Sequence, residues 1–162
     1  MLHRVFLTIF VLFFCACVSI NLPSSSAERA NKVQFQDPAE PFIQNKTKSA
    51  DKAWKNIKNG NSISYFSVCN ENSDPALESV LNEFLSSLDA HKVTKKDSVM
   101  FNDREALRAE AEGLLDGVKT RLQFLIFKKN NCTYSISFVG VTKYFDDDKG
   151  RFENFLNSFR AP

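Results

Sequence analysis

The chain has 162 residues, which is enough for one domain but not for two. Its composition, 43% hydrophobic and 25% charged, is ordinary for a globular protein. The net charge is only +2, whereas a nucleic-acid-binding protein carries a concentrated basic surface. We therefore expect no nucleic-acid partner. Five lysines recur over residues 46–58, but such a run usually marks a solvated segment rather than a membrane or nucleic-acid surface.

The N-terminus has the pattern of an export signal. A positive start that ends at Arg4 precedes an apolar run over residues 5–14. A transmembrane anchor is the alternative, but even residues 5–22 supply only about 18 residues, the minimum that spans a bilayer. That stretch also contains a serine and an asparagine. We therefore predict a leader over residues 1–17 and an exported domain.

Two processing routes fit this N-terminus. In the favoured route Cys17 is lipid-modified, because it directly follows the apolar run and the small residue Ala16. The surrounding residues depart from a lipobox, since Phe14 stands where Leu is usual and Cys15 where Ala or Ser is usual. In the second route, cleavage after Ala27 releases a soluble periplasmic or secreted protein. The favoured route predicts a lipoprotein that faces the periplasm and is anchored to a membrane of the bacterial envelope, such as the outer membrane.

Export also determines how the remaining cysteines are interpreted. Without the leader, Cys69 and Cys132 form an even pair in an oxidising compartment. We predict a disulfide between them, which would contribute about 4 kcal/mol by the loop-entropy model. Two buried thiols packed as small hydrophobic groups are the alternative.

The segment after the leader differs in composition from the rest. Residues 18–50 are rich in Ser, Asn, Gln and Pro and lack a sustained hydrophobic period, so we predict a flexible tether. A short strand over residues 33–35 is the one element expected within it. A single folded domain is predicted over residues 51–162, with its first elements close to Trp54.

Three elements follow in chain order. Residues 63–69 are rich in β-branched and aromatic residues and predict a strand. Asp74 and Pro75 have the residue types of a helix N-cap and a first helical position. The helix after them is amphipathic, because apolar residues recur at Leu77, Val80, Leu81, Phe84, Leu85 and Leu88. Another strand is predicted over residues 93–101.

The segment over residues 104–115 allows two interpretations. Its Ala, Leu, Glu and Arg content favours a helix, whereas Asp116-Gly117 is a strong signal for a hairpin turn. The strand register favours the hairpin, because pairing across a two-residue turn produces one apolar face and one face of paired charges at the same time. The apolar face pairs Ala111 with Leu122, Ala109 with Phe124 and Leu107 with Ile126. The other face pairs Glu112 with Arg121 and Glu110 with Gln123. We therefore predict a hairpin.

A third strand and a last helix complete the predicted fold. A three-residue turn over residues 129–131 extends the apolar face into a strand over residues 132–141. This register pairs Ile126 with Tyr134, Phe124 with Ile136 and Leu122 with Phe138. The acidic residues 146–148 suit a helix N-terminus, and the helix that follows is apolar at Phe152, Phe155, Leu156 and Phe159. The expected fold is an α+β sandwich, an antiparallel β-meander sheet packed with two amphipathic helices.

This order of elements resembles the PsbP/Mog-type fold and is similar to uncharacterised bacterial lipoproteins that carry such a domain. The resemblance runs from Trp54 to Phe159. It is carried by Ala53-Trp54-Lys55, Asn61–Cys69, Arg104–Leu107, Leu115–Val118, Lys128–Tyr134 and Phe152–Phe159. These motifs are turns, strand patterns and a helix face. Members of the fold are mostly binding or assembly factors of larger complexes and share no catalytic residues, so the resemblance implies an accessory role and transfers no site.

The candidate partner surface lies on the second face of the meander. Leu125, Phe127, Val139, Arg108 and Arg121 form a mixed apolar and basic patch there, which can mark a partner site, and Trp54 is a second candidate anchor. Cover of this face by one of the domain's own helices is nevertheless the favoured interpretation, as is packing of Trp54 in the core.

The residues indicate no catalytic, metal or cofactor site. His91 is the only histidine after the leader, and no nucleophile or orienting carboxylate accompanies it. Glu110 and Glu112 share a strand face but lie beside arginines, which favours a charged ladder. We therefore predict a non-enzymatic envelope lipoprotein whose domain binds another envelope protein. The alternatives are a periplasmic carrier of a small molecule or lipid and, third, a secreted enzyme of unknown class.

Overall fold

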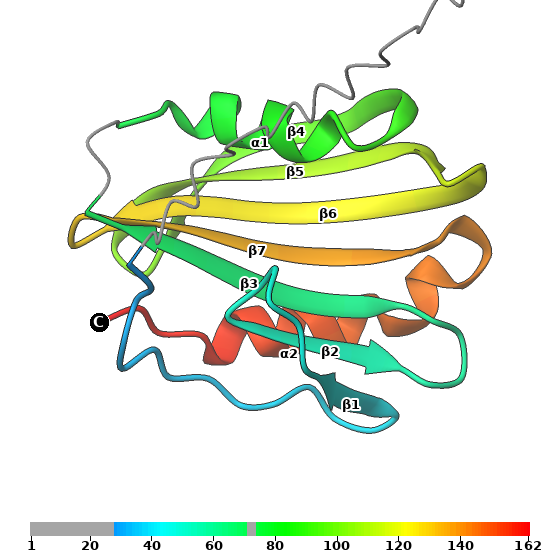
Figure 1. The fold of residues 1–162 in the computed structure, drawn as a ribbon, viewed down its shortest axis with the longest axis horizontal. Coiled ribbons are helices and arrows are strands. Elements are labelled where there is room, and N and C mark those ends of the chain that lie inside the picture. Colours follow the sequence, from blue (N-terminus) through cyan, green and yellow to red (C-terminus); the bar gives the residue numbers. More distant parts are fainter. Residues whose placement is uncertain (1–27, 71–73) are drawn as a thin grey trace, which may run out of the picture.

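The computed structural model of the protein describes residues 28–70 and 74–162. Seven strands form one antiparallel sheet in the order β1-β2-β3-β7-β6-β5-β4 (Figure 1). The strands are β1 (Phe42–Asn45), β2 (Lys52–Asn56), β3 (Ser62–Cys69), β4 (Asp89–Phe101), β5 (Arg104–Leu115), β6 (Val118–Lys129) and β7 (Cys132–Val141). One face carries helix α1 (Leu77–Leu85), and the other carries the 3-10 helix η1 (Thr142–Asp148) and helix α2 (Lys149–Ser158).

This architecture confirms the predicted α+β fold of a meander sheet with two helices. The predictions for the leader, for lipidation of Cys17 and for cleavage after Ala27 concern residues outside the described part of the chain. Within residues 28–70 and 74–162, no helix is long and apolar enough to cross a membrane.

The hairpin of β5 and β6 has the predicted register. Leu107 lies opposite Ile126, and Asp116 and Gly117 form a two-residue turn with φ angles of +50° and +78°. These left-handed angles are the ones that a type I′ turn requires. Residues 104–115 are therefore a strand despite their helical propensity, because pairing with β4 and β6 and burial of one face outweigh that propensity.

The turn between β6 and β7 is one residue shorter than predicted. Asn130 and Asn131 have φ angles of +49° and +58° and form a second two-residue turn. The predicted pairs are therefore wrong by one residue, and the observed pairs are Phe127 with Tyr134, Leu125 with Ile136 and Gln123 with Phe138. Because side chains alternate along a strand, this shift moves the apolar side of β7 to the opposite face of the sheet.

Each face of the sheet carries its own core. The core under α2 consists mainly of aromatic rings, among them Trp54, Tyr65, Phe127, Tyr134, Phe138, Phe145, Phe152, Phe155 and Phe159. The core under α1 is smaller and mostly aliphatic, with Leu81, Leu85, Leu88, Leu107, Leu122, Phe124 and Ile126. Alternate residues of β6 enter the two cores, so this strand is buried on both faces.

Residues 28–50 belong to the folded domain, and the predicted tether is wrong for this stretch. Phe35 packs at ring-centroid distances of 5.4 to 5.7 Å against Tyr65, Trp54 and Phe155. The strand expected over residues 33–35 is a single bridge, in which Gln34 and Arg160 exchange two backbone hydrogen bonds. A few large apolar side chains are enough to order this polar segment, because the core under α2 offers them an apolar surface.

The starts of both helices differ in detail from the prediction. Helix α1 has Ala76 at its N-cap position and no side-chain cap, so Asp74 and Pro75 precede the helix. Asp74 forms an ion pair with Lys128 instead. At α2, Asp148 occupies the N-cap position that the acidic run predicted, but its side chain makes no capping hydrogen bond.

Candidate binding groove

The apolar part of the predicted partner surface lies inside the folded domain. Leu125 and Phe127 are 2% and 0% exposed and belong to the core under α2. Trp54 is 2% exposed and packs against Phe35 and Phe155. The candidate patch is therefore not exposed. Helix α2 covers this face of the sheet, as the favoured interpretation expected, and the N-terminal segment (residues 28–50) covers it as well.

The other residues of the predicted patch do not form one surface. Arg108 pairs with Glu153 of α2. Arg121 lies over the ring of Phe145 and contacts three carboxylates, those of Glu110, Glu112 and Asp146. Val139 lies on the opposite face, beside the core under α1, because of the one-residue shift in β7.

The predicted disulfide is present between Cys69 and Cys132. Cys69 ends β3, Cys132 begins β7, and the two residues lie opposite each other in the register. The bond therefore joins two neighbouring central strands whose cysteines are 63 residues apart in the sequence.

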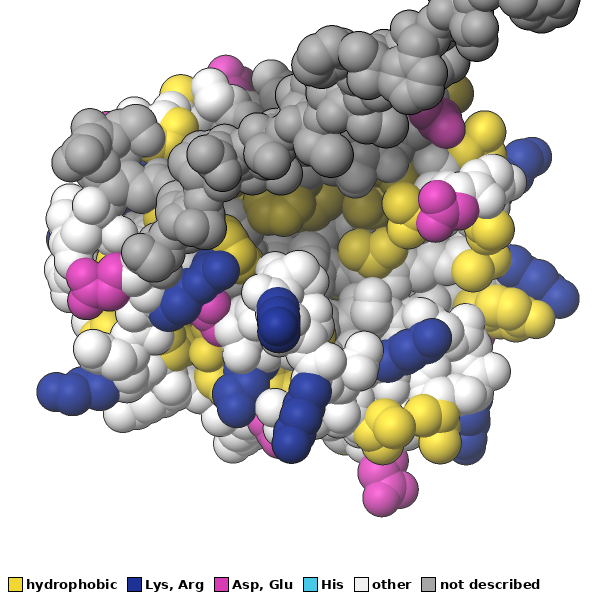
Figure 2. Space-filling model, in the orientation of Figure 1, with side chains coloured by type: hydrophobic (Ala, Val, Ile, Leu, Met, Phe, Trp, Pro, Cys, Tyr) yellow, Lys and Arg dark blue, Asp and Glu magenta, His cyan; other side chains and the backbone are white. Residues whose placement is uncertain are grey.

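An open groove lies on the α1 face of the sheet. Helix α1 packs against β5 and β6 and leaves the adjoining strands β7 and β3 less covered on this face. The resulting α1 groove has a volume of about 450 Å³, and Figure 2 shows hydrophobic side chains on the floor of a hollow in this face. Its lining consists of Arg29, Ser49, Phe66, Val68, Pro75, Val80, Glu83, Phe84, Ser87, Thr133 and Ser135.

The floor of the α1 groove is apolar and its rim is polar. Phe66 and Val68 come from β3, Val80 and Phe84 come from α1, and all four are partly buried. The ring of Phe84 also packs against Phe124 of the core, at a centroid distance of 5.5 Å. Hydroxyl groups of serine and threonine complete the lining. Such a surface suits an apolar side chain or alkyl chain that carries polar groups at its ends.

Arg29 bounds the groove on the side of the N-terminal segment. Its guanidinium lies over the ring of Phe66, 3.9 Å from the centroid, and its Nη1 donates a hydrogen bond of 2.8 Å to the backbone oxygen of Ser67. The carboxylate of Asp51 lies 3.6 Å from the same guanidinium and balances part of its charge. Glu28 forms a bridge with Cys69, so the first described residues run along this part of β3.

The α1 groove was not among the predicted sites, although β3 carries a signal for it. The second half of this strand is apolar on both faces, since Tyr65 and Cys69 face one side and Phe66 and Val68 the other. A strand that is apolar on both faces indicates cover or binding on both faces. The sequence of β3 does not indicate how far α1 extends over this strand. It therefore does not distinguish cover by the helix from an open binding surface.

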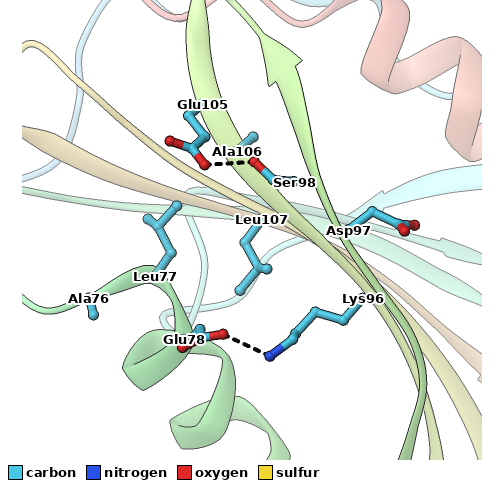
Figure 3. A pocket seen from close by; sticks show the side chains of 9 residues that line it. All are labelled: Ala76, Leu77, Glu78, Lys96, Asp97, Ser98, Glu105, Ala106 and Leu107. Atoms are coloured by element: carbon cyan, nitrogen blue, oxygen red, sulfur yellow. Dashed lines mark hydrogen bonds and ion pairs between the residues drawn. The ribbon is translucent and has the colours of Figure 1, made fainter.

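A second pocket, of about 340 Å³, lies between the start of α1 and the hairpin of β4 and β5 (Figure 3). Its polar groups already bind one another. The Nζ of Lys96 donates to Glu78, and the hydroxyl of Ser98 donates to Glu105, each at 2.7 Å. Figure 3 also shows Asp97 directed away from the helix. Because its polar groups are paired, this pocket is a weaker candidate than the α1 groove.

A buried polar cluster lies at the edge of β3, out of reach of a substrate. Ser67 is 0% exposed; its hydroxyl donates to Asp51 and accepts a 2.8 Å hydrogen bond from the backbone N–H of Ala30. Burial raises the pKa of Asp51 despite the hydrogen bond from Ser67. Burial, together with the charges of Asp51 and Tyr134, raises the pKa of Tyr65 to about 12. The cluster ties the N-terminal segment to the sheet.

Among the residues that the structure describes, no group of three His, Cys, Asp or Glu side chains could hold a metal ion. His91 is exposed, and its Nδ1 lies 3.2 Å from the backbone oxygen of Leu88.

No family model and no curated protein matches the sequence. The structure, however, is similar to cyanobacterial PsbP (CyanoP) from Synechocystis sp. PCC 6803, with a TM-score of 0.60 and 10% sequence identity over 88% of this chain and 96% of that chain. It is also similar to LpqN from Mycobacterium tuberculosis, with a TM-score of 0.61 and 6% identity over 86% of this chain and 88% of that chain. The chain therefore has a PsbP-like α+β fold, as its turns, strand patterns and closing helix predicted.

Proposed function

We propose that the protein is a non-enzymatic accessory domain of the bacterial cell envelope that binds a segment of another envelope protein in the α1 groove. The observation that carries this proposal is the groove itself, in which Phe66, Val68, Val80 and Phe84 line a hollow that opens at the surface. Apolar surface rimmed by polar groups is typical of partner and ligand sites.

Three arguments support the envelope location. The leader predicted over residues 1–17 would export the domain, and a lipid on Cys17 would hold it at a membrane on the periplasmic side. The disulfide between Cys69 and Cys132 suits an oxidising compartment. The fold is shared with LpqN, a protein involved in cell envelope biogenesis.

The shape of the groove supports a polypeptide partner. Its walls come from the N-terminal segment, β3, α1 and β7, and it opens along the face of the sheet. An apolar side chain of a partner can therefore reach Phe66 and Phe84 without displacing α1. Polar groups at the rim, such as the carboxylate of Glu83 and the hydroxyl of Ser87, can bind the backbone on either side of that side chain. An apolar anchor in a pocket with a polar rim is the usual centre of a protein interface.

The test places a photoreactive p-benzoylphenylalanine at position 83 in the native host. Glu83 is exposed and lines the groove, whereas the neighbouring Asn82 is exposed on the same helix and does not line it. We expect ultraviolet light to produce an adduct of polypeptide mass from position 83 and none from position 82. Ser87→Trp, which fills the groove from the exposed end of the helix, should abolish the adduct, and Asn82→Trp should leave it. An adduct that persists with Ser87→Trp would contradict binding in the groove.

A carrier of a small molecule or lipid is the second candidate, and the groove volume of about 450 Å³ favours it. Pockets that bind small ligands usually have volumes of about 300 to 1,000 Å³. The same experiment separates the two functions, because a carrier would give an adduct at position 83 with the added mass of a small molecule. An adduct of neither kind would overturn both proposals.

A further inference from the structure

The hairpin of β1 and β2 concentrates the positive charge of the domain. Residues 42–60 contain five lysines and one carboxylate, whereas the other described residues contain 15 basic and 17 acidic side chains. All five lysines are exposed: Lys46, Lys48, Lys52, Lys55 and Lys58. None of them forms an ion pair with another described residue. The single carboxylate, that of Asp51, already pairs with Arg29.

Two exposed isoleucines lie within this basic hairpin. Ile43 of β1 is 54% exposed and lies opposite Lys55 in the register. Ile57 directly follows β2, is 66% exposed and donates its backbone N–H to the oxygen of Pro41. Both isoleucines therefore lie at the outer edge of the sheet, next to the lysines. Figure 2 shows Lys and Arg side chains gathered over this hairpin with hydrophobic side chains among them.

Exposed aliphatic tips surrounded by lysines are the combination that an anionic lipid surface binds. Lysine ammonium groups are attracted by the negative headgroups, while aliphatic side chains enter the boundary between headgroups and acyl chains. Single-stranded nucleic acid would instead require exposed aromatic rings for stacking, and the exposed apolar residues of this hairpin are aliphatic.

We propose that the basic hairpin, defined as Ile43, Lys46, Lys48, Lys52, Lys55, Ile57 and Lys58, is a docking surface for an anionic phospholipid bilayer. It is separate from the floor of the α1 groove and does not depend on what the groove binds. A lipid on Cys17 would act together with it, because the anchor would hold the domain close to the bilayer and the basic hairpin would bind the lipid surface directly.

The test measures binding of the chain from residue 28 onward, which contains both cores and lacks the apolar leader. Co-sedimentation is compared between vesicles of pure phosphatidylcholine and vesicles that also contain phosphatidylglycerol. We expect binding only to the anionic vesicles and its loss at about 1 M salt, where the Debye length falls to about 3 Å. Lys55→Gln with Lys58→Gln should lower the partition coefficient about 25-fold, since each lysine near such a surface contributes a factor of about five.

Matched controls keep the proposal falsifiable. Lys92 and Lys119 are exposed lysines outside the hairpin, so Lys92→Gln with Lys119→Gln should lower binding far less. Ile57→Ser should weaken binding while leaving the charge unchanged. Equal binding to neutral vesicles, or equal losses for the two lysine pairs, would overturn the proposal. Binding to polyglutamate but to neither kind of vesicle would also overturn it and assign the surface to an acidic polypeptide.

Discussion

The carboxylate of Asp148 links two parts of the chain that are far apart in the sequence, residues 56–61 and residues 148–151. Its Oδ2 accepts hydrogen bonds of 2.8 Å from the side-chain amides of Asn56, Asn59 and Asn61, and its Oδ1 accepts one of 3.0 Å from Arg151. The residue is 1% exposed. Burial alone raises the pKa of this carboxyl group, but the three asparagine hydrogen bonds and the charge of Arg151 outweigh burial and hold the pKa below its ordinary value of 3.8.

We expect Asp148→Asn to lower the free energy of unfolding by about 2–3 kcal/mol at pH 7, because an amide cannot accept all these hydrogen bonds. A pKa that is lowered in the folded state contributes stability above the pKa of the unfolded chain, about 3.9, and this contribution is lost as the pH falls through the folded pKa. The difference between the two proteins in urea denaturation should therefore shrink progressively as the pH falls below about 3.9, the unfolded value. Asp147→Asn, at the exposed neighbour, is the control and should change stability by less than about 0.5 kcal/mol.

Gly140 of β7 lies directly against the side chain of Asn61. A Cβ at this position would collide with the amide of Asn61, which cannot withdraw because it donates to Asp148 and to the backbone oxygen of Tyr144. We expect Gly140→Ala to cost about 1–3 kcal/mol in thermal or urea denaturation. Gly150 of α2 has open space around its Cβ position, so Gly150→Ala should instead be neutral or stabilise by up to about 1 kcal/mol. Equal effects of the two substitutions would contradict this account.

At the scale of elements, the sequence predicts pairing well where a turn has one clear length. Asp116-Gly117 defines a two-residue turn, and every pair predicted for β5 and β6 is observed. The run of residues 129–131 allows either a two- or a three-residue turn, because asparagine readily adopts left-handed φ angles. The choice of length decides which face of the sheet receives Tyr134, Ile136 and Phe138. The ambiguous length of this turn and the unforeseen cover by residues 28–50 together explain why the candidate partner surface lies in the core of the structure.

The disulfide gives a prediction at this scale. It connects β3 to β7 across a separation of 63 residues, which includes α1, β4, β5 and β6. We expect the double variant Cys69→Ala, Cys132→Ala to unfold with a free energy lower by about 4 kcal/mol, because the loop of the unfolded chain is no longer closed. A reducing agent should lower the melting temperature of the original protein and leave that of the double variant unchanged. An equal response of both proteins would mean that the two cysteines are not bridged.

At the scale of the whole molecule, the composition of the sequence leads to a predicted domain start at residue 51, which is too late. Residues 28–50 carry the Pro, Gln and Asn content of a linker, yet Val33, Phe35 and Phe42 pack on the core under α2. Composition averages over a segment, whereas burial depends on single large side chains and on whether the rest of the fold offers them an apolar surface. The α1 groove is also difficult to predict from the sequence, because it forms where α1 does not extend over the whole width of the sheet.

The position of the domain boundary gives the last prediction. A chain that starts at residue 51 lacks β1 and the Phe35 side chain, and it uncovers the core around Trp54 and Tyr65. We expect it to be less stable to urea than a chain that starts at residue 28, and to be cleaved faster by protease. Within the longer chain, Phe35→Ala alone should cost about 3 kcal/mol, since it removes an aromatic ring from the core, whereas Gln36→Ala at an exposed neighbour should be neutral. If residues 28–50 were a tether, the two chains would unfold at the same urea concentration and Phe35→Ala would have no effect.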